Sequence, residues 1–201
     1  MFLAKTLRSL IFLAALLVFG SASAYAQGSC TLCTSVSSTL TLTATVETSI
    51  LLNISTGTGG ATVTDGGSGA FSVPFGNVNG LGVGTPAAGV SVSTSGSGAT
   101  YTTPIFVTPN FSGFSNSTAT VKVYQDSATS AASQSAAREG VAAGSVASVP
   151  TTAGSANTVT ATAASTSALA RYVGVFVSNA NGGSAVSGTL SPKFIYQVTV
   201  N

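Results

Sequence analysis

The sequence contains no histidine and no tryptophan, and charged residues make up only 5% of it. Without histidine the chain lacks the commonest general base, the commonest metal ligand, and the Ser-His-Asp and Cys-His catalytic arrangements. No spacing pairs any two of the carboxylates, as a glycosidase requires, so we expect them to be solvated or to form turns; they are Glu47, Asp65, Asp126 and Glu139. These absences predict a protein that is not an enzyme and binds no cofactor and no metal.

Long apolar runs are missing except near the N-terminus. Residues 1–26 combine Lys5 and Arg8 with an apolar run from Leu10 to Phe19 and an Ala-Tyr-Ala ending, a pattern typical of a secretory signal peptide cleaved after Ala26. The run is shorter than the roughly 20 residues that a membrane-spanning helix needs. We therefore expect export to the periplasm, the cell surface or the medium, with no membrane insertion after cleavage.

Positive charge is also scarce beyond the expected signal peptide. The basic residues that remain after cleavage balance the four acidic ones; they are Lys122, Arg138, Arg171 and Lys193. No basic patch is available to attract nucleic acid or anionic lipid. The surface must instead be polar through Ser, Thr, Asn and Gly.

The only two cysteines, Cys30 and Cys33, form a C-x-x-C motif in an N-terminal segment, residues 27–38. A redox site of this spacing needs a helix N-terminus or nearby cations, and a zinc site needs two further ligands. The flanking residues supply neither. In an oxidising compartment we expect a local disulfide, and pairing between two chains remains the alternative.

Period-two alternation of apolar and polar residues is the strongest structural signal. It occurs in residues 39–46, where Leu40, Leu42, Ala44 and Val46 share one face, and again in residues 194–200 near the C-terminus. Such alternation predicts half-buried strands. An apolar run, Ile50–Ile54, follows the first segment and predicts an extension of that strand or its neighbour.

Further short segments are rich in β-branched or aromatic residues and are bounded by Gly, Pro, Asn or Ser; they are residues 70–78, 89–95, 100–109, 118–125, 157–163 and 171–178. Because proline cannot donate to a strand ladder, we expect Pro74, Pro104 and Pro109 at sheet edges or at interruptions. The pattern predicts an all-β fold, a single antiparallel Ig-like sandwich of about seven to nine strands over residues 39–201.

Two regions of low complexity interrupt this pattern. Residues 127–167 are rich in Ala, Ser and Thr and read as a long excursion between strands, within which residues 130–140 form either a short helix or a mobile loop. Asp65, in the stretch TDGGSG, is a single acidic residue, whereas a calcium loop supplies several at fixed spacing. We therefore expect a turn that links two strands there.

Three stretches carry a resemblance to known families: residues 44–55 (ATVETSILLNIS), residues 71–78 (FSVPFGNV, with a phenylalanine-glycine turn) and residues 187–201 (SGTLSPKFIYQVTVN). An exported chain with these features resembles bacterial secreted β-sandwich families of the spore-coat-protein-U and pilin-like type. The resemblance implies an Ig-like sandwich in the periplasm or on the cell surface. In some relatives of that type, subunits assemble into fibres by strand donation, with a periplasmic chaperone and an outer-membrane usher as partners.

The chain departs from chaperone-usher pilins at two points. Its cysteines form a C-x-x-C motif, whereas those pilins usually have a pair spaced widely enough to link strands. Tyr196 is the aromatic residue closest to the C-terminus, whereas those pilins often have an aromatic residue next to that end.

The alternating segment before Ile50 has two interpretations. Strand donation needs an N-terminal stretch of alternating apolar residues that completes the sheet of another subunit. A candidate donor strand with this pattern comprises Leu40, Leu42, Ala44 and Val46. The same residues also fit the first strand of the chain's own sandwich, and we take this as the first expectation.

These observations predict a structural or adhesive protein of the bacterial cell envelope. In the most specific version of this prediction, the protein is a fibre subunit that self-associates. The alternative is a secreted module that binds carbohydrate or another surface ligand. Such a module would rely on exposed aromatic side chains, and the candidates are Tyr101, Phe106, Phe111, Phe114 and Tyr124.

Overall fold

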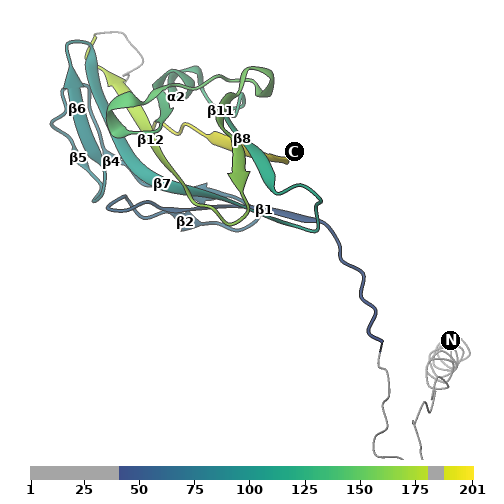
Figure 1. Ribbon diagram of the computed structural model, residues 1–201. Helices are drawn as coiled ribbons and strands as arrows, with labels where there is room; N and C mark the ends of the chain where they lie inside the picture. Colours follow the sequence, from purple (N-terminus) through teal and green to yellow (C-terminus); the bar gives the residue numbers. More distant parts are fainter. Residues whose placement is uncertain (1–40, 181–187) are drawn as a thin grey trace, which may run out of the picture. The chain divides into compact units, whose positions relative to one another are not determined.

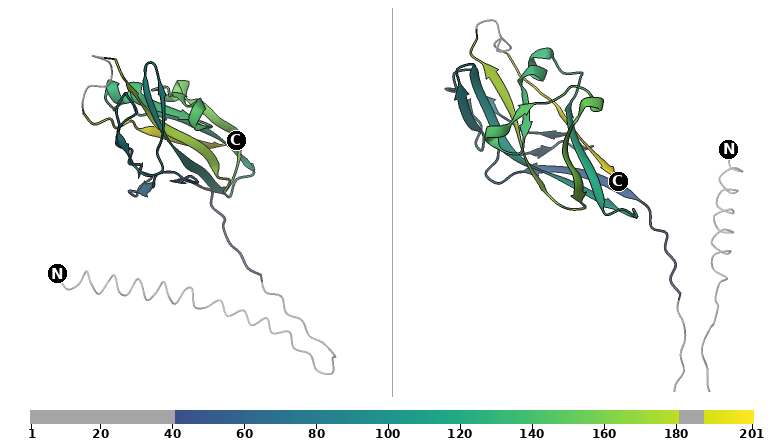
Figure 2. Two further views of the ribbon diagram at one scale, coloured as in Figure 1. Left: turned by 90° about the vertical axis from the view of Figure 1, so that its left-hand side faces the viewer. Right: turned by 45° about the horizontal axis from the view of Figure 1, so that its top comes forward.

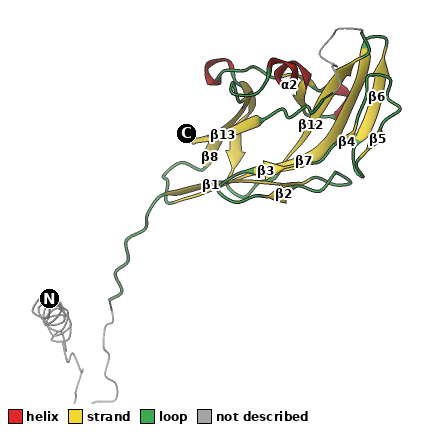
Figure 3. Ribbon diagram, turned by 180° about the vertical axis from the view of Figure 1, so that it is seen from behind, coloured by secondary structure: helices red, strands yellow, loops and turns green. Residues whose placement is uncertain are grey.

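The computed structural model describes residues 41–180 and 188–201 (Figure 1). The contacts between residues divide the chain into residues 1–45 and a compact unit that comprises Val46–Asn201, which we call the β unit. The described part of the β unit consists of antiparallel sheets with one short α-helix and two 3₁₀ turns, which confirms the all-β antiparallel prediction. Figure 3 shows the strands in yellow and the helices in red. The expected signal peptide, Cys30, Cys33 and Leu40 lie outside the described residues.

The largest sheet has six strands in the order β1-β7-β12-β9-β10, with β6 also paired to β7. Its strands are β1 (Ser49–Thr56), β6 (Ser91–Ser95), β7 (Gly98–Ser112), β9 (Ala137–Gly140), β10 (Ala147–Ser148) and β12 (Leu169–Ser178). A second sheet has the order β11-β8-β13, with β8 (Thr118–Gln125), β11 (Asn157–Ala164) and β13 (Phe194–Val200). Most of these strands fall on the segments that the residue pattern predicts.

Two small hairpins complete the β structure. One pairs β2 (Thr64–Asp65) with β3 (Phe71–Ser72), and the other pairs β4 (Gly76–Asn77) with β5 (Thr85–Pro86). Asp65 Oδ1 accepts a hydrogen bond of 2.8 Å from the Gly67 N–H in the first hairpin. The prediction of a turn at Asp65 that links two strands is therefore confirmed.

β7 is the longest strand and organises the six-stranded sheet. One side of it pairs with β12 over ten residue pairs, and the other side pairs first with β6 and then with β1. Because β6 and β1 follow each other along the same side, β7 alone spans both. At about 3.3 Å per residue its 15 residues measure roughly 45 Å.

Pro104 and Pro109 lie inside the central strand β7 and not on an edge strand, but each faces a place where pairing with a neighbouring strand is interrupted, which agrees with the second form of the prediction. The Pro104 carbonyl accepts a hydrogen bond of 3.1 Å from the Gly57 N–H. The missing N–H of Pro104 therefore faces the same side, where the β6 ladder ends at Thr102 and the β1 ladder begins at Ile105. No ladder hydrogen bond is lost at this junction.

Pro109 also costs no ladder hydrogen bond, but its nitrogen faces the other side of β7. Its carbonyl accepts a hydrogen bond of 2.8 Å from the Thr166 N–H, in the turn before β12. The ladder between β12 and β7 begins only at the pair Leu169 and Val107, so the proline nitrogen faces a position without a strand. Pro74 agrees with the prediction, because it separates β3 from β4.

The main hydrophobic core receives side chains from both large sheets. It contains Ile105 and Val107 of β7, Val121 and Val123 of β8, Val173 of β12 and Tyr196 of β13, together with Val149 and Ala163. Val121 and Val123 are fully buried, and burial of such a side chain contributes about 1.5–3 kcal/mol. This core joins the two sheets.

Residues 127–167 contain more structure than a simple excursion. The α2 helix (Ala131–Ala136) begins at Ser130, whose hydroxyl accepts a hydrogen bond from the Ser133 N–H, and β9 follows the helix directly. Two 3₁₀ turns, Ala143–Ser145 and Ala153–Ser155, lie between β9 and β11. The helix prediction for residues 130–140 is confirmed for its first part, and the second part becomes a strand.

The expectation that residues 39–46 form the first strand of the chain's own fold is wrong for the part that the structure describes. Residues 41–48 adopt no strand or helix, and all of them are exposed. The exposed fraction is 83% for Leu42 and 80% for Val46. The first strand of the fold is instead β1, which begins at Ser49.

Candidate functional site

A groove of about 1340 Å³ lies in the described part of the β unit. Its base is formed by the inward-facing residues of β12, Val173, Val175 and Val177, and by Ile105 of β7. Residues 69–81 line one wall, and residues 188–196 line the other. This volume exceeds the range of about 300–1,000 Å³ that is typical of small-molecule sites, so the groove suits an extended chain better than a small ligand.

The groove continues between β1 and β13. A second hollow of about 380 Å³ is lined by residues 50–52 and 54 of β1 and by residues 194–196 of β13, and it shares Ile54, Phe71 and Tyr196 with the first. β1 and β13 are in contact, but they exchange no ladder hydrogen bonds. Figures 1 and 2 show β13 ending at the end of the β unit where β1 begins.

Two strand edges therefore border the groove without a partner in the described part of the chain. β13 is the last strand of its sheet and pairs on its other side with β8, while β1 pairs on its other side with β7. An unpaired edge presents backbone N–H and C=O groups that can pair with another strand. The groove thus combines apolar side chains in its base with hydrogen-bonding groups along its sides.

A buried polar cluster lies under this groove and fixes the position of β13. Arg171 of β12 donates to Glu139 of β9 through Nε at 2.6 Å and through a second guanidinium nitrogen at 2.8 Å, and the Tyr196 hydroxyl donates to Glu139 Oε1 at 3.1 Å. Glu139 and Arg171 are 4% and 8% exposed. The cluster connects the six-stranded sheet to β13 of the other sheet, so its role is structural.

The surroundings of this cluster change the acidity of its members. Burial, followed by the negative charge of Glu139, raises the pKa of Tyr196 well above its ordinary value of 10.0. Burial opposes the charge of Arg171, but the hydrogen bond and the charge of Glu139 outweigh it and raise the pKa of Arg171. The neutral tyrosine and the charged arginine are therefore both favoured in the folded state.

The prediction that the acidic residues are solvated or form turns holds for three of them and is wrong for Glu139. Glu47 is exposed, Asp65 caps its turn, and the partly exposed Asp126 lies 3.9 Å from the exposed Lys193. Glu139 is buried because Arg171, 32 residues later, supplies two hydrogen bonds to its carboxylate. In residues 41–180 and 188–201, no three Asp, Glu, His or Cys side chains gather as a metal site would require.

The aromatic candidates for ligand binding do not gather on one surface. Tyr101 is fully buried, Phe106 and Tyr124 belong to different sheets, and both are partly buried. Phe111 and Phe114 alone form a close pair among these candidates, with ring centroids 6.4 Å apart in an edge-to-face arrangement. Phe114 is 36% exposed, which leaves a limited aromatic surface at the end of β7.

Comparison with family models, curated proteins and solved structures gave no match. Within the described ranges, no helix combines the length and apolar character needed to cross a bilayer. The groove itself is the feature that residue patterns did not predict, because it depends on which strand edges remain unpaired.

Proposed function

We propose that this chain is an exported, non-enzymatic structural protein of the bacterial cell envelope and that it acts as a fibre subunit. In this proposal the β unit is an incomplete Ig-like sandwich. Residues 40–46 of one copy occupy the groove of the next copy and add a strand to the free edge of β13. The resemblance to secreted pilin-like families, the export signal pattern and the lack of charge support this assignment.

The observation that carries the proposal is a groove and, in the same chain, an exposed segment with a matching pattern of apolar residues. The groove has an apolar base and two unpaired strand edges. The segment that precedes β1 has alternating apolar residues, and its described members Leu42 and Val46 are exposed. Addition of an extended segment to an exposed strand edge uses main-chain hydrogen bonds for affinity and side-chain sites for selection.

The residues between this segment and β1 favour donation to another copy over insertion into the same β unit. To enter its own groove, the segment would have to reverse direction immediately before Ser49. Tight hairpin turns favour Gly, Asn or Asp, and the connecting residues are Glu47 and Thr48. Self-insertion would therefore require an unfavourable turn.

Fibre subunits of this kind need protection before assembly, because an open apolar groove invites aggregation. We accordingly propose a periplasmic chaperone that covers the groove and an outer-membrane usher that exchanges it for the next subunit. Adjacent genes for such proteins would support this part of the proposal.

The test is electrophoresis of the purified full-length protein with and without heating. We expect a ladder of polymers in unheated samples that collapses to the monomer on heating. Leu42→Asp should abolish the ladder, because it places a carboxylate against the apolar base of the groove. Thr43→Asp is the matched control, because the neighbouring residue of a strand points to the opposite face, and it should keep the ladder.

A peptide experiment checks that the groove is the acceptor. A synthetic peptide of residues 36–46 should bind the Leu42→Asp protein and raise its melting temperature, since a ligand of the folded state stabilises it. The same peptide with the leucines replaced by serine should not. A wild-type protein that is only monomeric, or a ladder that survives Leu42→Asp as well as Thr43→Asp, would overturn the proposed function.

A further inference from the structure

The free edge of β13 presents a defined set of backbone groups. At one end of the strand the Asp126 N–H donates to the Lys193 carbonyl at 3.0 Å. Near the other end the Asn201 N–H donates to the Thr118 carbonyl at 3.1 Å. Residues 193 and 201 therefore direct their backbone groups toward β8, and every second residue between them does the same. The intervening residues direct N–H and C=O groups to the free edge; they are Phe194, Tyr196, Val198 and Val200.

The same four residues turn their side chains toward the core. All of them are buried or partly buried, whereas Gln197 and Thr199 between them are exposed. Directly opposite residues of an antiparallel pair share one face of a sheet. A donated antiparallel strand that buries its alternating apolar residues must therefore place each of them opposite one of these four residues. The opposed residues then also exchange backbone hydrogen bonds.

Length and side-chain size favour one register. Residues 40–46 and β13 have seven residues each, so a full antiparallel pairing opposes Val46 with Phe194, Ala44 with Tyr196, Leu42 with Val198, and Leu40 with Val200. Each of these pairs joins a larger side chain to a smaller one, as good packing requires. A parallel pairing would oppose two large residues, Leu42 and Tyr196. Antiparallel pairing is also the slightly more stable of the two.

The buried polar cluster gives the space opposite Tyr196 a fixed size. The Tyr196 hydroxyl donates to Glu139 Oε1 at 3.1 Å, and Arg171 holds the same carboxylate through hydrogen bonds of 2.6 and 2.8 Å. Rotation of the tyrosine ring would break its hydrogen bond inside a buried cluster, which is unfavourable. A donor side chain larger than that of Ala44 would therefore meet a ring that does not move aside, and the site would be overpacked.

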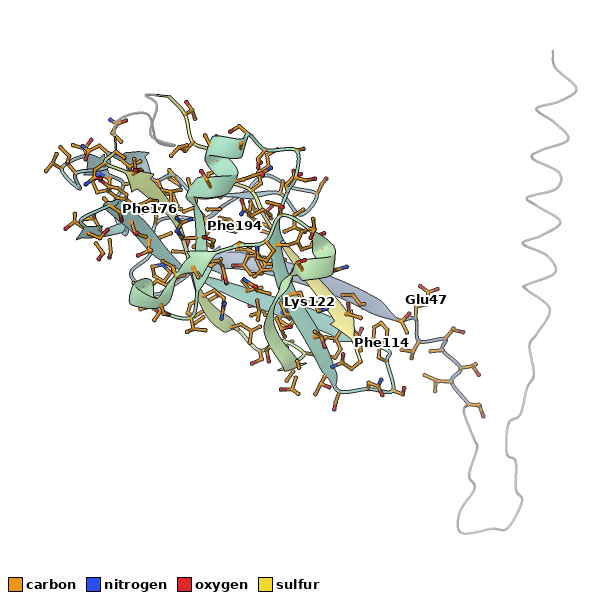
Figure 4. All side chains as sticks on the ribbon, turned by 90° about the horizontal axis from the view of Figure 1, so that it is seen from above. Glu47, Phe114, Lys122, Phe176 and Phe194 are labelled. Carbon is orange, nitrogen blue, oxygen red and sulfur yellow. The ribbon has the colours of Figure 1, made fainter. Side chains whose placement is uncertain are left out.

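The position opposite Phe194 is less confined. Figure 4 shows Phe194 in the middle of the β unit, between Phe176 and Phe114. Its side chain is partly buried and lines the large groove. Because a phenylalanine ring has no polar atom that ties it to a neighbour, Phe194 can change rotamer. Val46 and Ala44 of the donor thus face two aromatic rings, of which one can adjust and the other is held in place.

We propose that Tyr196 selects a small residue at position 44 of the donor and thereby fixes the register of the donated strand, which runs antiparallel to β13 with Val46 opposite Phe194. The occupant is residues 40–46 of a second copy of this chain. This inference rests on the proposed function and deepens it, because it names the pair of residues that sets specificity. The buried cluster around Glu139 then has a second role, which is to hold the ring that the donor contacts.

The first test measures size selection, with peptides of residues 36–48 as donors and the Leu42→Asp protein as acceptor. The Ala44→Leu peptide should bind about tenfold more weakly than the wild-type peptide, because it overpacks the site. Val46→Leu is the matched control, since it places the same side chain opposite Phe194, and it should bind as tightly as the wild-type peptide. Neither change lies in the acceptor, so neither can unfold the β unit.

A change in the acceptor tests the hydroxyl of Tyr196 as the anchor. Tyr196→Phe keeps the ring but removes its hydrogen bond to Glu139. The Ala44→Leu peptide should then bind almost as tightly as the wild-type peptide. A preference that stays tenfold in the Tyr196→Phe acceptor would show that this anchor does not set the selection.

The second test identifies the register by disulfide trapping in the full-length protein, with Cys30→Ser and Cys33→Ser so that only introduced thiols are present. The inference places Thr41 of the donor opposite Thr199 of the acceptor, on the exposed face. Opposed residues that exchange no hydrogen bonds have Cα atoms about 4.5 Å apart, which a disulfide can bridge. Thr41→Cys with Thr199→Cys should therefore give a ladder that survives heating and collapses when reductant is added.

Two further cysteine pairs are the controls for this register. Thr41→Cys with Gln197→Cys would cross-link if the donor were shifted by two residues, and Thr41→Cys with Ile195→Cys would cross-link in a parallel arrangement. In the proposed register the first of these pairs is diagonal, with Cα atoms roughly 7–8 Å apart, and the second is farther apart. Neither pair should form a disulfide.

The outcomes separate this inference from the proposed function. If the wild-type protein forms no polymers, the proposed function fails and takes this inference with it. If polymers form but the Ala44→Leu and Val46→Leu peptides bind alike, or a control cysteine pair cross-links in place of Thr41 and Thr199, the register is wrong while strand donation stands. Weaker binding of the Ala44→Leu peptide alone, together with a cross-link between positions 41 and 199, supports the inference.

Discussion

Residues 39–46 and residues 194–200 carry nearly the same alternation of apolar and polar residues, yet the structure treats them differently. The second segment is β13, paired with β8 along its length and connected to the core through Tyr196. The described part of the first segment has no strand partner and exposes Leu42 and Val46. Alternation therefore predicts that a segment can form a half-buried strand, but it does not indicate which chain supplies the partner.

The largest expected loss of folding free energy follows from removal of Arg171, which belongs to the buried polar cluster that fixes the position of β13. Arg171→Met leaves the buried Glu139 carboxylate without its cation, and such a loss costs about 3–5 kcal/mol. Urea denaturation of the monomeric Leu42→Asp protein, with and without Arg171→Met, measures this loss. Lys193→Met is the control, because the Lys193 side chain is exposed and lies 3.9 Å from Asp126, and it should change the free energy of unfolding by less than about 1 kcal/mol.

One alanine substitution in each of the two segments sharpens the comparison. Val198→Ala of β13 removes two methyl groups that pack against the main core, and we expect it to lower the free energy of unfolding of the monomer by about 1–2 kcal/mol. Leu42→Ala should change it by less than about 0.5 kcal/mol, because Leu42 is exposed in the monomer. Equal losses in the two variants would show that residues 39–46 do pack within their own chain.

The smallest expected effect concerns alkaline pH. The pKa of Tyr196 is raised in the folded state by burial and by Glu139, so the unfolded chain loses this proton first as pH rises above about 10. The contribution of this group to stability is complete well below that pH and falls as pH rises above it.

The control for this prediction is Tyr196→Phe, which should flatten the alkaline part of the curve of unfolding free energy against pH. Denaturation curves collected between pH 8 and pH 11 measure both proteins. Parallel curves over that range would show that Tyr196 does not contribute to the alkaline loss of stability.

Much of the strand pattern could be read from the sequence because it depends on neighbouring residues. β8 and β13 coincide with their predicted segments, and β12 begins two residues before its own. The position of Pro104 could not be predicted in this way. Its tolerance depends on where β6 ends and β1 begins on the neighbouring side of β7, and that is a property of the assembled sheet.

The features around the candidate site were harder to predict for the same reason. Glu139 meets an arginine 32 residues away and a tyrosine 57 residues away, and no local pattern announces either contact. The sequence makes Tyr101 a candidate for an exposed aromatic side chain, but in the structure its hydroxyl donates a hydrogen bond to the Asn79 carbonyl. The groove is lined by residues of both sheets and of the segments that connect them, so it depends on the three-dimensional arrangement and not on a local pattern.

The pairing of β1 with β7 has a mechanical consequence for a fibre. Tension along a chain of strand-linked subunits would enter each β unit at Ser49 and pull β1 along its own axis. The eight residue pairs between β1 and β7 would then be loaded together rather than opened one after another. Because the β7 ladder with β12 continues beyond the reach of β1, the load would pass from β1 through β7 to β12.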